Sequence, residues 1–376
     1  MLELLNLKPE AFGLDISDLS LKIIKLKKKG KRLSLASFGE SKIKPGIIKE
    51  GEIKDEEKLA ETIKEAIKNV KGKRLKTKYV VASLPEEKAF LQVIQMPKMA
   101  EEDLKSAVIY EAENYIPLPI EEVYLDSQIV PPAYNHLDHF DVLLAALPKK
   151  TVNPYLASLK RAGLQPKALE IESLSIARAL IKDGVTTSPV LIIDLGATRT
   201  SFIVFSGHSL RFTSSISVSS GSFNEIISKN LGVSLSEAER LKIKYGLEEK
   251  TELKIKDKKT EVKKERGEIF EALVPALVDL VQQIKKHLAY YQSHASHEHL
   301  PSNGKGLSKI LLCGRGANLK GLTELLALVL KMPVKLANPW VNILPEGKRE
   351  TPELPFENSL GYTTALGLAL RGIREK

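Results

Sequence analysis

Cysteine is almost absent from this chain of 376 residues, which has a single one, Cys313. A lone cysteine excludes an intrachain disulfide and a zinc site built from cysteines, so we expect a reducing compartment. Long apolar runs are also missing, because no window approaches the roughly 20 apolar residues that span a bilayer. Met1–Glu10 has neither the basic start nor the apolar length of a secretory signal. The sequence therefore predicts a water-soluble, cytoplasmic protein.

Aromatic residues are scarce at 6%, whereas 57 Lys+Arg exceed 47 Asp+Glu and give a formal net charge of +10. Nucleic-acid binding favours basic residues interleaved with aromatics. The basic stretches here, such as Lys25–Arg32 and Lys71–Lys78, are diluted by Gly and Leu. We interpret the excess mainly as solvated surface, with an acidic membrane face or nucleic acid as the alternative, and expect no nucleic-acid partner.

One structural pattern occurs twice. A short apolar strand that ends in an aspartate, a turn and a second strand occur around Asp15 and again around Asp194, which is 194 − 15 = 179 residues later. The backbone of such a turn can bind phosphate. A third turn, Cys313–Asn318, places Gly-Arg-Gly after a predicted strand, so that the backbone can approach a flat ligand. No Gly-x₄-Gly-Lys-Ser/Thr loop is present, which disfavours a P-loop enzyme.

A block with a different order interrupts the first copy of this pattern. Between Phe90 and Gly163 the predicted elements are strand, helix, strand, strand, helix, as in a small α+β module with helices on one face of a short sheet. We interpret this block as an inserted subdomain. Further along, a long helix is predicted over Ile269–Gln292, and the charged run Lys250–Glu268 before it is interpreted as an exposed hairpin or loop.

With these motifs the chain resembles the actin-like ATPases, bilobed α/β proteins with a duplicated ribonuclease-H-like fold. Phe12–Leu26 is similar to the first phosphate motif, Ile192–Phe205 to the second and Leu312–Leu322 to the adenosine motif. Leu169–Leu180 and Tyr362–Leu370 resemble the two connecting helices.

The inserted block is similar to the extra subdomain of the FtsA-like branch. Within that branch, Glu111–Pro117 most resembles the PilM family of type IV pilus assembly proteins. The resemblance implies four parts, which are a first lobe core (10–88 and 164–188), the inserted subdomain (89–163), a second lobe core (189–221 and 306–374) and a second-lobe small subdomain (222–305).

The resemblance also implies a site for ATP and Mg²⁺ in the cleft between the lobes. Asp15 and Asp194 would hold Mg²⁺ through water, because this ion dehydrates reluctantly. The other residues implied to contact the nucleotide are Ser17, Lys22, Gly196, Ala197, Thr198, Gly221, Glu239, Lys242, Gly314, Arg315 and Gly316. Glu172 stands where some relatives keep a carboxylate that orients the attacking water, and the alternative is an ordinary acid at a helix start.

Three residues depart from the family pattern. Ser17 stands where a glycine is expected, Asp18 adds a carboxylate near the phosphates, and Ser220 replaces the first glycine of a Gly-Gly pair. These departures argue against fast hydrolysis more than against nucleotide binding. At most a slow ATPase is expected.

For a PilM-like protein the resemblance implies an ATP-binding scaffold, peripheral to the cytoplasmic face of the inner membrane. A groove between the first lobe and the inserted subdomain would bind the N-terminal cytoplasmic tail of a PilN-like membrane protein. A link to the pilus motor ATPases is also implied, and self-association is left open. The alternatives are an FtsA-like division protein, disfavoured because the chain stops at Lys376 directly after a core-like helix, and a phosphotransferase of the sugar-kinase type, which needs a more open glycine turn than Ser17-Asp18.

Overall fold

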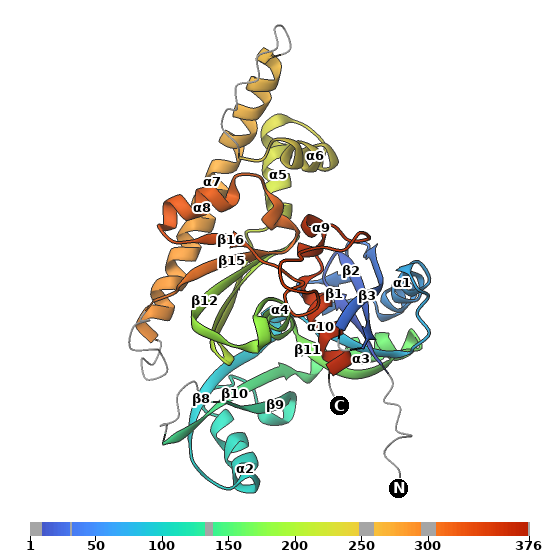
Figure 1. Ribbon diagram of the computed structural model, residues 1–376, viewed down its shortest axis with the longest axis vertical. Coiled ribbons are helices and arrows are strands. Elements are labelled where there is room, and N and C mark those ends of the chain that lie inside the picture. The colour runs from blue at the N-terminus through green and yellow to red at the C-terminus, as the bar shows by residue number, and fades with distance from the viewer. Residues whose placement is uncertain (1–9, 31, 132–137, 248–258, 295–305, 375–376) are drawn as a thin grey trace. The chain divides into compact units, whose positions relative to one another are not determined.

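The computed structural model describes residues 10–30, 32–131, 138–247, 259–294 and 306–374 (Figure 1). Contacts group the chain into two compact units. Unit 1 comprises Met1–Thr187, Phe205–Thr213 and Asn338–Lys376, and unit 2 comprises Ser188–Val204 and Ser214–Ala337. Residues 338–374, predicted to belong to the second lobe, are grouped by their contacts with unit 1. The four-part division as a whole stays a prediction.

Unit 1 is built on a six-stranded sheet with the strand order β11-β7-β1-β2-β3-β6. The strands are β1 (Phe12–Ile16), β2 (Ser20–Lys29), β3 (Arg32–Lys42), β6 (Lys71–Gly72), β7 (Tyr79–Leu84) and β11 (Gln165–Ile171). β1 runs parallel to β7 and antiparallel to β2. Two further short strands, β4 (Ile48–Lys49) and β5 (Glu52–Ile53), pair only with each other.

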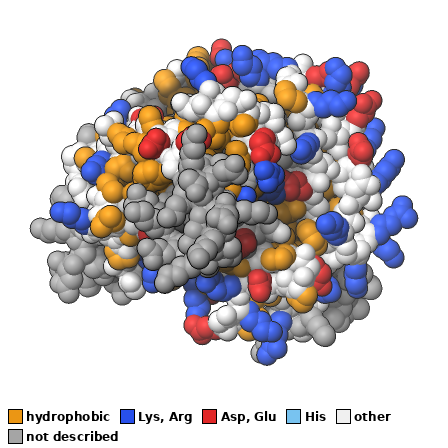
Figure 2. All heavy atoms as spheres, turned by 90° about the horizontal axis from the view of Figure 1, so that it is seen from above, with side chains coloured by type: hydrophobic (Ala, Val, Ile, Leu, Met, Phe, Trp, Pro, Cys, Tyr) orange, Lys and Arg blue, Asp and Glu red, His pale blue; other side chains and the backbone are white. Residues whose placement is uncertain are grey.

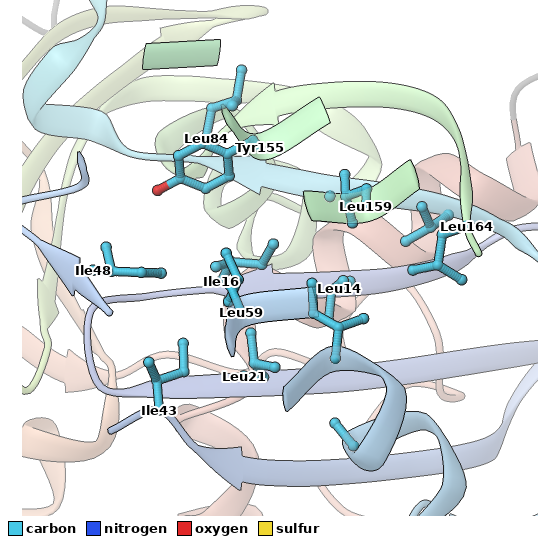
Figure 3. Packing of buried hydrophobic residues seen from close by; sticks show 14 of the residues in the cluster. Leu14, Ile16, Leu21, Ile43, Ile48, Leu59, Leu84, Tyr155, Leu159 and Leu164 are labelled. Atoms are coloured by element: carbon cyan, nitrogen blue, oxygen red, sulfur yellow. The ribbon is translucent and has the colours of Figure 1, made fainter. Parts of the chain in front are cut away.

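Helices cover both faces of this sheet. They are α1 (Glu56–Lys68), α3 (Lys149–Arg161), α4 (Glu172–Leu180) and α10 (Thr363–Arg374). Side chains of a strand alternate between its faces, so Leu14 and Ile16 of β1 enter a core shared with α1 and α3. Figure 3 shows these residues near Leu59 of α1 and Tyr155 of α3.

Glycines allow the opposite face of β1 to lie close to α10. A Cβ atom added to Gly13 would lie 2.6 Å from the Ala369 nitrogen, and one added to Gly367 of α10 would overlap the Ser175 carbonyl group of α4. Any larger residue at either position would therefore separate elements whose close packing positions the end of β1.

The inserted block forms a separate three-stranded sheet with the order β8-β10-β9. Its elements are β8 (Phe90–Pro97), α2 (Glu101–Ala112), β9 (Val123–Val130) and β10 (His139–Pro148), with their own core. The prediction that both helices of the block cover this sheet is wrong for α3, because its side chains Val152, Tyr155 and Leu159 belong to the core of the six-stranded sheet.

Unit 2 is built mainly on a five-stranded sheet with the order β14-β13-β12-β15-β16. The strands are β12 (Thr186–Leu195), β13 (Thr200–Gly207), β14 (Ser209–Ile216), β15 (Lys309–Cys313) and β16 (Val334–Leu336). The helices are α5 (Ser220–Leu231), α6 (Leu235–Tyr245), α7 (Lys259–His294) and α8 (Leu322–Leu330). By its contacts, the turn end of the β13–β14 pair, Phe205–Thr213, groups with unit 1.

Two predicted boundaries are wrong. Helix α7 begins at Lys259, so 259–268 is helical rather than a hairpin or loop, as the strong helix propensity of Lys and Glu permits; residues 250–258 lie outside the described part. The predicted connecting helix Leu169–Leu180 begins only at Glu172, because Leu169–Ile171 pair with β7.

The last helices are α9 (Phe356–Leu360) and α10. None of the helices in the described ranges is long and apolar enough to cross a membrane.

The close approach of α4 and α10 predicts that Gly367→Ala lowers the melting temperature and destabilises unit 1 by about 1–3 kcal/mol through overpacking. The matched control is Gly267→Ala in α7, where an added Cβ meets nothing within 4 Å. Alanine is the better helix former, so this control leaves the melting temperature unchanged or raises it. Thermal unfolding followed by circular dichroism compares them. Equal melting temperatures for Gly367→Ala and the wild type would contradict the described packing.

Candidate functional site

The first predicted phosphate turn connects β1 to β2 in unit 1. Asp15 lies opposite Lys22 in the antiparallel register, and the Lys22 Nζ atom is 3.5 Å from the Asp15 Oδ2 atom. Lys22 also donates to the Ser20 hydroxyl at 3.1 Å. The structure therefore brings together Asp15, Ser17 and Lys22, the three residues predicted from this turn.

Asp15 is buried, at 4% exposure. Burial raises the pKa of its carboxyl above the ordinary value, and the Lys22 ammonium partly offsets this effect. The Ser83 hydroxyl donates to Asp15 Oδ1 at 3.3 Å and accepts from the Ile16 N–H at 2.8 Å. Ser83 thereby fixes the end of β1. The Asp15 carboxyl group is thus buried between the Lys22 ammonium and the Ser83 hydroxyl, and its predicted role in holding Mg²⁺ stays a prediction.

Asp18 has a structural role at this turn. Its carboxylate accepts hydrogen bonds from the N–H groups of Glu50 and Gly51, at 3.2 and 3.0 Å. Both of these residues have positive φ, of 51° and 73°. The carboxylate of Asp18 therefore holds the 50–51 loop.

The second predicted turn, in unit 2, repeats the hydrogen bond of the first. The Gly196 N–H donates to the Arg199 carbonyl at 3.0 Å, as the Ser17 N–H donates to the Ser20 carbonyl at 3.0 Å. In each case the turn begins two residues after the aspartate, Asp15 or Asp194. The duplication inferred from sequence thus extends to the backbone of the two turns.

The second turn offers donors for an anion. Among the described residues, the N–H groups of Ala197 and Thr198 have no hydrogen-bond partner, and Ala197 is exposed. The Ala197 carbonyl accepts from the N–H of Gly221, near the start of α5. A Cβ at Gly221 would meet this oxygen. Adjacent N–H groups in a turn form an anion-binding concavity, so this turn fits a phosphate group.

Asp194, at the end of β12, lies beside the glycine turn after β15. The Cys313 thiol is 3.7 Å from the Asp194 Oδ1 atom, and the two residues are partners in the parallel register. Gly314 has a φ of 78°, and a Cβ there would lie 2.6 Å from the Leu195 carbonyl oxygen. Gly316 is packed as closely on Leu195, whereas the Arg315 side chain is exposed.

Lys242 of α6 is a buried ammonium group, at 6% exposure. Its Nζ atom donates to the carbonyl and the hydroxyl oxygen of Ser220, each at 2.7 Å. Burial lowers the pKa of Lys242 to about 8, against the opposing effect of the Glu239 carboxylate. Glu239 lies one helical turn earlier and is exposed. Lys242 thus connects α6 to the first residue of α5, next to the second turn.

Glu172 is the first residue of α4 and is half-buried. The buried acid at this helix start is Glu86, whose Oε2 atom accepts from the Ser173 N–H at 3.2 Å. Burial raises the pKa of Glu86, and hydrogen bonds from Ser173 and Thr213 oppose that rise. Glu86 therefore stabilises the α4 amino terminus, and the catalytic role of Glu172 stays a prediction.

Unit 1 contains a cavity of about 180 Å³ beside the three-stranded sheet. Phe90 of β8 and Leu144 of β10 line one side, and Tyr115, which follows α2, lines another. Thr213 of β14, the residue that hydrogen-bonds to Glu86, also lines it. Apolar residues predominate in its lining, and Gln92, Tyr115 and Thr213 add polar side-chain groups, a combination that suits a short peptide or small ligand.

Sequence reasoning missed three residues of these sites. Ser83 is a small polar residue near the end of the mostly apolar strand β7, and a polar residue in such a run was the available signal. Ser220 was treated only as a departure from Gly-Gly, although its hydroxyl binds Lys242. Glu86 carried no signal, because its partners Ser173 and Thr213 are 87 and 127 residues away in sequence.

The two units, each with a sheet and an aspartate-containing turn, define an actin-like fold. A solved PilM-PilN type IV pilus biogenesis complex contains a chain that is 28% identical, with a TM-score of 0.78 over 97% of this chain and 99% of that one. MreB 5 of Spiroplasma citri, solved bound to AMPPNP, shares the fold at 14% identity and a TM-score of 0.53, over 97% of this chain and 96% of that one. The cell division protein FtsA of Streptococcus pneumoniae is 23% identical over 87% of this chain and 75% of its own length.

A family model described as type IV pilus assembly protein PilM matches residues 13–373. The chain belongs to this family.

The burial of Asp15 predicts an unusual pH dependence for Asp15→Asn. A carboxyl whose folded pKa is raised stabilises the fold below its ordinary pKa, and this stability is lost as pH rises through the folded value. We therefore expect Asp15→Asn to melt above the wild type at pH 7 and to lose this advantage toward pH 4.

Asp55→Asn is the matched control. The pKa of Asp55 is lowered by its bonds to Lys58, and its carboxylate accepts from the Lys58 N–H at the start of α1. This variant should melt below the wild type at pH 7, with the difference shrinking as the pH falls. Thermal melts over this pH range make the comparison. The same sign for both substitutions would contradict the assigned environment of Asp15.

Proposed function

We propose that this chain is an ATP-binding scaffold of a type IV pilus assembly platform, peripheral to the cytoplasmic face of the inner membrane. In this role it binds the N-terminal cytoplasmic tail of a PilN-like membrane protein and connects the platform to the motor ATPases. The observation that carries the proposal is the cavity of unit 1 beside the three-stranded sheet, in a chain that matches the PilM family over residues 13–373.

The donor set of unit 2 supports nucleotide binding. The free N–H groups of Ala197 and Thr198 suit phosphate oxygens, and Asp194 suits Mg²⁺ held through water. Lys242 and Glu239 on one side of α6 suit the polar ribose and base. Gly314 and Gly316, which pack closely on Leu195 of β12, are the predicted contacts for the flat ring of the base. When bound, Mg²⁺ would neutralise phosphate charge, and Asp15, Ser17 and Lys22 are the predicted contacts from unit 1.

Hydrolysis, if present, is expected to be slow. Ser17 bonds to Ser20 through both its N–H and its hydroxyl, at 3.0 and 3.1 Å. A turn closed in this way and carrying a side chain offers phosphate less open backbone than a glycine does. Nucleotide therefore acts on the conformation of the scaffold rather than as a rapidly consumed substrate.

Removing the Lys242 ammonium should weaken binding of a fluorescent ATP analogue measured with Mg²⁺. We expect Lys242→Gln to raise the Kd at least about ten-fold, or about 1.4 kcal/mol. The wild-type Kd should rise as the pH exceeds about 8, where Lys242 loses its charge, and the variant should lack this dependence.

The control is Lys244→Gln, two residues further on α6, where the exposed ammonium bonds to the Tyr245 hydroxyl at 2.6 Å. Its Kd should equal that of the wild type. Unchanged affinity in Lys242→Gln, or in an Asp194→Ala variant, would contradict the nucleotide site.

The cavity of unit 1 supports recognition of a peptide tail. Tyr115 is 43% exposed at its rim, and the floor comes from neighbouring β8 and β10, in which Gln92 pairs with Leu144. A cavity of about 180 Å³ suits one or two side chains of an extended tail rather than a whole folded domain. In this proposal an apolar side chain of the tail occupies the cavity.

Truncation of the cavity rim should weaken binding of a synthetic peptide with the tail sequence of the PilN-like protein. We expect Tyr115→Ala to raise the peptide Kd at least about ten-fold, since aromatic anchors dominate such sites. Tyr110→Ala is the control, because Tyr110 is 74% exposed in α2 and does not line the cavity. Fluorescence anisotropy measures both. An equal rise of the peptide Kd in the two variants would mean that the peptide binds outside the cavity, which would contradict the proposal.

A further inference from the structure

The edge of the six-stranded sheet where β1, β7 and β11 begin is rich in cations. Two parts of the sequence that contribute to it, 19–39 and 66–85, contain no Asp or Glu. The sheet brings them together, because β3 pairs with β6 and the Lys73 N–H donates to the Ala36 carbonyl at 2.9 Å. The start of β11 joins them, since Gln165 pairs with Tyr79.

The segment 73–78 crosses the sheet at this edge. It leaves β6, at the outer side of β3, and enters β7, which lies beyond β2 and β1. Gly13, near the start of β1, pairs with Ile24 of the antiparallel strand β2. Strand β2 continues to Lys29, so the turn between β2 and β3 extends past the start of β1. We define the basic edge by its exposed cations, which are Lys28, Arg32, Lys73, Arg74, Lys76, Lys78 and Lys167.

These cations are not neutralised. Within the described ranges none of the seven has an acidic partner within 4.0 Å. Other exposed cations do pair, as Lys54 does with Glu52 at 2.7 Å and Lys58 with Asp55 at 2.7 Å. On the face drawn in Figure 2, acidic side chains also lie among the basic ones. The basic edge is therefore a concentrated positive charge that calls for an anionic partner.

The composition of the basic edge favours a lipid surface over nucleic acid. Five of its seven cations are Lys, a point charge, whereas base and phosphate recognition in nucleic acids favours the planar Arg fork. Single-stranded nucleic acid also requires exposed aromatic rings for stacking. The aromatic residue at this edge, Tyr79, is half-buried, and the ammonium groups of Lys78 and Lys167 lie 6.0 and 4.8 Å from its ring centroid.

We propose that the basic edge of unit 1 binds the anionic headgroups of a phospholipid bilayer directly. This contact adds to attachment through a membrane partner and does not require the peptide cavity. Each Lys or Arg near an anionic bilayer contributes about a five-fold gain in partitioning. Several cations on one edge therefore give measurable binding without any inserted apolar segment.

The test is flotation of the full chain with vesicles of phosphatidylglycerol and phosphatidylcholine in equal parts, in about 0.1 M salt, where charges act over about 10 Å. The wild type should float with these vesicles, remain free with pure phosphatidylcholine, and be released in about 1 M salt. The variant Lys73→Glu/Lys76→Glu/Lys78→Glu should lose at least about 100-fold in partition coefficient.

The matched control is Lys229→Glu/Lys309→Glu/Lys335→Glu, which reverses three exposed lysines of unit 2 and changes the net charge equally. The partition coefficient of this control should fall by less than about ten-fold. A second variant, Lys28→Glu/Arg32→Glu, reaches the same edge from another segment and should also weaken flotation. Equal losses in the two triple variants, equal flotation with pure phosphatidylcholine, or binding of duplex DNA without flotation would each overturn the proposal.

Discussion

The close packing of α10 against both β1 and α4 is the constraint on which unit 1 depends. Gly13 and Gly367 remove the side chains that would separate these elements. Asp15 lies two residues after Gly13, so its side chain leaves the strand on the same face, and its burial follows from this packing. The raised pKa of Asp15 and its reliance on Lys22 and Ser83 are further consequences. Packing density thus sets the electrostatics of the first turn.

The duplication was the most predictable feature, because each copy of the pattern consists of residues that are adjacent in sequence. An apolar strand, an aspartate and a turn are adjacent residues, and the two turns share the same backbone hydrogen bond from Ser17 and from Gly196. The strands and helix α2 of the inserted block were predictable for the same reason. The packing of α3 was not, because a helical stripe shows which face is buried but not which sheet buries it.

Contacts between distant segments account for the residues that were missed. Ser83 contacts Asp15 across 68 positions, and Glu86 contacts Ser173 across 87. Nothing in the sequence near Glu86 indicates that it stabilises the start of α4. Asp18 was noted in the sequence only as an added carboxylate, and its role in the fold was missed: two backbone N–H groups of the 50–51 loop donate hydrogen bonds to it. The hydrogen-bond partners of such polar side chains can be identified only from the folded structure.

The cavity of unit 1 and the start of α4 share one carboxylate. Thr213 lines the cavity and also donates to Glu86, whose remaining partner is the Ser173 end of the helix. A molecule that enters the cavity and competes for the Thr213 hydroxyl deprives the buried anion of a donor, which increases its affinity for a proton. A protonated Glu86 is a weaker acceptor for the helix terminus. The wall of the cavity and the amino terminus of α4 are therefore linked through the Glu86 carboxyl group.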